Sequence, residues 1–106
     1  MNISVEITDH LPDNGSVAIG DVIFTKTDFS EALEGIDLCK DKDQGRYYLK
    51  CTAKQYNVLN RLGHEINNAI IHEFVTMHIE FMKTLVIVME EDELGRKILD
   101  IIRKKV

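Results

Sequence analysis

Apolar residues in the second half of the chain recur at steps of three or four residues without losing phase. An average step near 3.6 residues places side chains on one face of an α-helix. The pattern therefore predicts one long helix from about Ala53 to Met89. Its apolar face consists of Leu59, Leu62, Ile66, Ile70, Phe74, Met77, Phe81, Leu85 and Val88.

The start of this helix has a local signal, whereas its continuity depends on two ambiguous segments. Thr52 and Gln55 have the spacing of a capping box. Gly63 costs about 1 kcal/mol relative to alanine, but the apolar phase continues through it, so we expect one helix with at most a kink there. Residues 84–89 are rich in β-branched side chains and fit a buried strand or a continued helix. Helix is favoured because no glycine or proline separates them from the preceding pattern.

The first half of the chain alternates apolar and polar residues, as half-buried strands do. The alternation runs through residues 3–7 and resumes over residues 17–24. Between them, Pro12-Asp13-Asn14-Gly15 is typical of a tight turn. The alternation slips at Gly20-Asp21, which predicts a β-bulge or a second bend.

Three further elements follow from turn and cap residues. Residues 27–35 resemble a short helix, with Thr27 as N-cap and Gly35 as C-cap. Residues 36–40 and 46–51 predict a hairpin. After an acidic hinge at residues 90–93, a last helix is expected to turn one face inward, made of Leu94, Ile98, Ile101 and Ile102.

These elements predict an α+β fold: a small antiparallel sheet of two hairpins and three or four strands, then one long α-helix and a shorter C-terminal helix. At 106 residues we expect one domain over residues 1–106. Its β-rich half is 1–51 and its helical half is 52–106.

The predicted long helix is longer than the domain that carries it. It would span ~55 Å, whereas a compact domain of this length is only ~33 Å across. A second apolar stripe runs beside the first from Ile71 to Met89, and so wide a face needs two covering surfaces. The chain's own sheet is one, and a second copy of the chain is the expected other, because two-fold dimers are the commonest oligomers. The predicted interface consists of Ile70, Phe74, Met77, His78, Phe81, Met82, Leu85 and Met89.

His78 lies within the second apolar stripe. A single histidine in such a place is expected to be neutral and hydrogen-bonded. The alternative is a pH-sensitive interface, because histidine changes charge between about pH 5 and 8.

Composition narrows the class of protein. A net charge of −5 argues against a dedicated nucleic-acid binder. No apolar run is long enough to span a membrane, and the first residues lack signal-peptide character, so a cytoplasmic protein is expected. Cys39 and Cys51 fit a reducing compartment. We expect two structural thiols nearly opposite each other on the hairpin, with a cross-strand disulfide as the alternative.

No motif commits the chain to catalysis. Phosphate loops, nucleophile elbows and Cys–His signatures are absent from the sequence. Glu65, His72 and Glu80 share the polar face of the long helix, but His72 and Glu80 are two turns apart and do not have the spacing of a zinc site. We expect a solvated face, no metal, no cofactor and no enzymatic activity.

Two functions remain. The first is a non-enzymatic homo-oligomeric interaction module, such as a small regulator, adaptor or inhibitor, that binds a partner protein through or beside the long helix. The alternative is an oligomeric binder of a small anionic or nucleotide-like ligand, with a pocket at the subunit interface. Candidate ligand-binding residues for this alternative are Arg46, Tyr47, Tyr48, Arg103 and Lys104.

Overall fold

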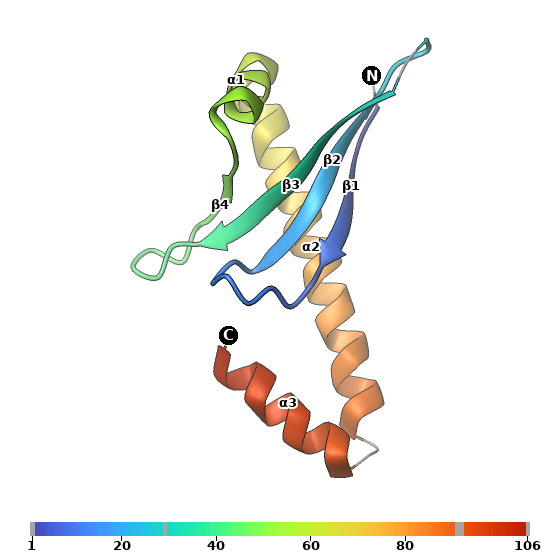
Figure 1. The fold of residues 1–106 in the computed structure, drawn as a ribbon, viewed down its shortest axis with the longest axis vertical. Coiled ribbons are helices and arrows are strands. Elements are labelled where there is room, and N and C mark those ends of the chain that lie inside the picture. Colours follow the sequence, from blue (N-terminus) through green and yellow to red (C-terminus); the bar gives the residue numbers. More distant parts are fainter. Residues whose placement is uncertain (1, 29, 91–92, 106) are drawn as a thin grey trace.

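The α+β fold predicted from the sequence is confirmed. The computed structural model describes residues 2–28, 30–90 and 93–105. Within these residues a four-stranded sheet precedes three helices (Figure 1). The elements are β1 (Asn2–Asp9), β2 (Ala18–Thr25), β3 (Ser30–Lys40), β4 (Tyr47–Lys50), α1 (Ala53–Leu62), α2 (His64–Glu90) and α3 (Glu93–Lys105).

The sheet is antiparallel in the order β1-β2-β3-β4, and α2 crosses one of its faces (Figure 1). Beyond the sheet α2 runs past the ends of the strands, and α3 folds back beside it. The molecule is therefore elongated, with extents of 49 × 33 × 20 Å. Its radius of gyration is 15.5 Å, against ~13 Å for a compact domain of this length. The predicted overhang of the long helix is confirmed.

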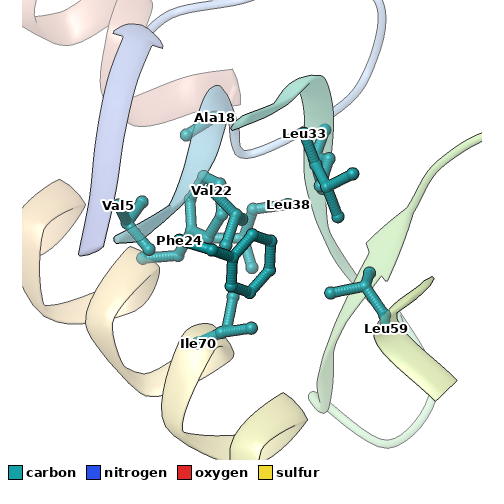
Figure 2. Packing of buried hydrophobic residues seen from close by; sticks show 10 residues of the cluster. Val5, Ala18, Val22, Phe24, Leu33, Leu38, Leu59 and Ile70 are labelled. Atoms are coloured by element: carbon teal, nitrogen blue, oxygen red, sulfur yellow. The ribbon is translucent and has the colours of Figure 1, made fainter. Parts of the chain in front are cut away.

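The hydrophobic core lies between the sheet and the helices. Figure 2 shows side chains from β1, β2, β3, α1 and α2 pointing toward one another. Ile70 and Phe74 of α2 are fully buried there, so the first half of the helix packs on the chain's own sheet. The buried cluster consists of Val5, Ala18, Val22, Phe24, Leu33, Ile36, Leu38, Leu59, Ile70 and Phe74.

A β-bulge between β2 and β3 confirms the slip predicted at Gly20-Asp21. Gly20 pairs with Ile36 and Val22 with Leu33, so β3 has one residue more than β2 over this stretch. The Asp21 carboxylate accepts a hydrogen bond from the Gly35 N–H at 3.0 Å.

The short helix predicted over residues 27–35 is wrong, because β3 begins at Ser30. The bulge explains the error. It turns both Leu33 and Ile36 into the core although they are three residues apart, which is a helical spacing.

The second hairpin is confirmed, but its register separates the cysteines. Cys39 lies opposite Tyr48, and Asp37 lies opposite Lys50, so Cys51 is not the cross-strand partner of Cys39. Both thiols are free. The expectation that the two cysteines lie nearly opposite each other is therefore wrong, because the register of the hairpin places Tyr48 opposite Cys39.

The long helix is interrupted at Gly63, which has a φ of 93° and separates α1 from α2. The expectation of one unbroken helix is wrong at this residue, because glycine alone adopts such a φ without strain. The Asn67 side chain connects the two helices by donating to the Leu59 and Gly63 carbonyls, each at 2.8 Å. The capping box of Thr52 and Gln55 is confirmed.

The C-terminal part of the chain is helical as expected, but α3 is oriented differently. Residues 84–90 continue α2, so the strand alternative is excluded. On α3 only Ile102 of the expected inner face is buried, whereas Ile98 is 40% and Ile101 62% exposed. Residues 91–92 of the predicted hinge and the Leu94 side chain lie outside the described part. No helix among the described residues is both long and apolar enough to cross a bilayer.

Gly20→Ala tests how closely α2 approaches the sheet. A Cβ at Gly20 would lie 2.7 Å from the Glu6 carbonyl oxygen and 2.8 Å from Phe74 Cε1, so backbone or helix must move. We expect a loss of about 1–3 kcal/mol of stability, and a Tm at least ~5 °C lower by circular dichroism. The exposed control Ser4→Ala should stay within about 0.5 kcal/mol of wild type. Equal stability of both variants would contradict this packing.

Candidate functional site

A groove of about 740 Å³ lies where the end of the sheet, the second half of α2 and the C-terminal part of α3 meet. Figure 1 shows α3 folding back toward the end of the sheet that carries the β1–β2 connection and the β3–β4 turn. The volume is within the usual range of small-molecule sites. The groove is lined by Val17, Lys40, Tyr47, His78, Ile79, Met82, Lys83, Val86, Ile102 and Arg103.

The apolar wall of this groove follows from the length of α2. His78, Met82 and Val86 are spaced by four residues and so lie on one face of the helix. Ile70 and Phe74, earlier along the helix, are buried against the sheet, but α2 runs on past the ends of the strands. The second apolar stripe therefore continues beyond the sheet, and the buried Ile102 of α3 also lines the groove.

Basic side chains supply the charge of the groove. Lys40 comes from β3, Lys83 from α2 and Arg103 from α3. The Lys40 ammonium lies 5.3 Å from the centre of the Tyr47 ring, within cation–π range. None of the described residues that line the groove is acidic, although the chain has 18 acidic and 13 basic residues. The groove is a local cationic site on an acidic protein.

A second cavity of about 490 Å³ adjoins the groove and shares Val17, Lys40, His78 and Ile102 with it. It extends beneath the β1–β2 connection, where His10, Leu11 and Pro12 contribute, and reaches Asp41 of the β3–β4 turn. His78 thus lies at the boundary of the two cavities.

His10 and His78 form a pair across this boundary. Their Nδ1 atoms are 3.3 Å apart, and the ring planes differ by 16°. The Phe81 ring stacks on His10 with centroids 3.9 Å apart. Burial lowers the pKa of both histidines; Asp9 opposes this effect at His10, and His10 lowers the pKa of His78 further. The pair is therefore neutral near pH 7, as expected for His78.

The candidate ligand-binding residues divide between the groove and the surface. Tyr47 and Arg103 line the groove. Arg46, Tyr48 and Lys104 are exposed and line neither cavity.

The predicted interface residues divide according to their position along α2. Ile70 and Phe74 are fully buried and Met77 packs against the same core, which leaves the first two no surface for a partner. His78 and Met82 line the groove. Phe81 is 37% exposed and Leu85 is half-buried. The side chain of Met89 lies outside the described part of the structure.

Sequence reasoning missed the contributions of His10, Val17, Lys40 and Lys83 to the site. No local pattern marks them, because each reaches the groove through tertiary packing of an ordinary loop, strand or helix position.

The polar face of α2 carries no assembled site among the described residues. Glu65, His72 and Glu80 are all exposed. Across the described chain, no three histidine, cysteine, aspartate or glutamate side chains lie close enough to hold a metal ion.

The groove combines an apolar wall with three basic side chains and a neutral histidine pair. Comparison with protein-family models, with curated proteins and with solved structures finds no match to this chain.

Proposed function

We propose that this chain is a non-enzymatic binding protein for a small amphipathic anion. The ligand has an apolar body and a carboxylate, sulfonate or phosphate group. The observation that carries the proposal is an apolar groove with three basic residues and no acidic residue among its described lining.

The two parts of the groove match the two parts of such a ligand. Burial of an apolar body against Ile79, Met82 and Val86 contributes about 25 cal/mol for each Å² removed from water. The anionic group is held by Lys83 and Arg103, and the arginine guanidinium suits carboxylate and phosphate oxygens because it donates in a planar fork.

The composition of the histidine pair favours binding over catalysis. The contact between histidines at the groove is the His10–His78 pair, in which both partners are the same kind of titratable group. General acid–base chemistry at neutral pH ordinarily needs an acid and a base of separated pKa.

We further propose a cytoplasmic location, which the two free thiols support.

Met82→Glu tests the groove directly. A carboxylate at this position would replace apolar wall by negative charge, so affinity for 8-anilinonaphthalene-1-sulfonate should fall at least about tenfold. Fluorescence titration measures the affinity. Asn68→Glu, an equal change of charge at an exposed position of the same helix, is the control and should bind like wild type. Equal affinity of the Met82 variant and wild type would place the probe elsewhere.

A second candidate function is the homo-oligomeric interaction module. The observation that favours it is an apolar surface outside the groove, where Ile98 and Ile101 of α3 and Phe81 of α2 remain exposed. Burial of such residues in a second copy would stabilise a dimer.

Sedimentation velocity separates the two candidates. If self-association uses this surface, wild type sediments as a dimer and Ile101→Glu as a monomer. Lys97→Gln, an equal change of charge on exposed α3 surface, should leave the dimer intact. A monomeric wild type at high micromolar concentration would remove the second candidate and leave the ligand-binding proposal standing.

A further inference from the structure

His10 and His78 join two distant parts of the chain at the boundary between the groove and the adjoining cavity. His10 belongs to the connection between β1 and β2, and His78 to α2. Their Nδ1 atoms are 3.3 Å apart, so one nitrogen donates a hydrogen and the other accepts it. Phe81 covers the His10 ring.

This contact limits how many protons the pair can hold. Two neutral rings satisfy it, and so does one imidazolium donating to one neutral ring, which is a charge-assisted hydrogen bond. Two imidazolium rings would bring N–H against N–H at 3.3 Å. The pair can therefore gain one proton without separating, but not two.

The charges around the pair decide when that proton is taken up. On the cationic side are Lys40 of β3, Lys83 of α2 and Arg103 of α3, which line the same groove as His78. Lys42 of the β3–β4 turn lines the adjoining cavity. On the anionic side are Asp9, next to His10, and Asp41, which lines the adjoining cavity. In the free protein, burial lowers the pKa of both histidines and His10 lowers that of His78 further, so the pair is neutral at neutral pH.

We propose that the groove binds its anionic ligand together with one proton, which the His10–His78 pair takes from solvent and holds. This inference rests on the proposed function. A negative group bound among Lys83, Arg103 and His78 attracts an imidazolium at this position and so favours the protonated pair. By linkage, a ligand that favours the protonated pair binds more tightly when the pair is protonated, so affinity increases as pH falls.

Between about pH 8 and 5.5 few other groups can produce this dependence. Lysine and arginine ordinarily stay charged over this range, and carboxylates ordinarily titrate near pH 4. The other two histidines, His64 and His72, are exposed on α2 and line neither cavity. They supply a matched control.

The test compares two fluorescent probes with nearly the same apolar body. 8-Anilinonaphthalene-1-sulfonate is negative throughout this range, whereas N-phenyl-1-naphthylamine lacks the sulfonate. For wild type we expect the affinity for the sulfonate to rise about tenfold from pH 8 to about 5.5. A change of this size corresponds to attraction between the sulfonate and one imidazolium roughly 10 Å away, at an effective dielectric constant near 20. The affinity for the uncharged probe should stay constant.

Variants assign the dependence to the pair. His10→Gln combined with His78→Gln keeps a polar contact but cannot titrate, and should bind the sulfonate with equal affinity at both pH values. His64→Gln combined with His72→Gln should keep the tenfold change. Near-UV circular dichroism checks that each variant is folded.

NMR titration of wild type keeps the proposal testable if the first double variant does not fold. The imidazole signals of His10 and His78 should titrate at higher pH in the presence of saturating sulfonate probe than in its absence. Unchanged titration would overturn the proposal.

Two further outcomes separate this inference from the proposed function. If wild type binds the sulfonate equally at both pH values, or the His10/His78 variant keeps the dependence, proton coupling is overturned and the binding site stands. If the sulfonate does not bind at either pH, the proposed function fails and this inference fails with it.

Discussion

α2 and the sheet approach each other closely at Gly20 and Phe74. A Cβ on Gly20 would lie 2.8 Å from Phe74, so the missing side chain lets the helix approach β2 closely. This contact fixes where along the sheet the helix lies. Because α2 has 27 residues, its second half then extends beyond the strands (Figure 1). The groove follows from that mismatch: Met82 and Val86 continue the apolar face, and α3 returns to cover only part of it.

Sequence patterns were reliable where one local interaction decides the structure. The capping box at Thr52, the hairpin strands and the overhang of the long helix all depend on nearby residues or on regular periodicity. They failed where pairing with another strand, or a positive φ that glycine adopts, determines the local structure. The sequence around Leu33 and Ile36 resembles a helix because these two core residues are three positions apart. The bulge opposite Asp21 explains how a strand can bury both of them. The apolar periodicity continues through Gly63, but the φ of 93° at this residue is not helical and ends α1 there.

The sequence predicted the kind of side chains at the candidate site better than it predicted where the site lies in the fold. Aromatic residues beside the hairpin turn and a basic C-terminal segment suggested an anionic ligand, and Tyr47 and Arg103 do line the groove. Their neighbours Arg46 and Lys104 are turned to solvent. The contact of His10 with His78 joins residues 68 positions apart. Nothing near either histidine specifies it, because it exists only once the β1–β2 connection and α2 are packed together.

Methyl-labelled NMR can show where a ligand binds on this protein. When 8-anilinonaphthalene-1-sulfonate is added, we expect the methyl signals of Ile79, Met82, Val86 and Ile102 to shift, because these side chains line the groove. Ile19 and Ile23 alternate with the core residues of β2 and so lie on the opposite face of the sheet, where no shift is expected. Shifts centred on Ile19 and Ile23, or spread evenly over all methyl groups, would contradict a binding site between the sheet, α2 and α3.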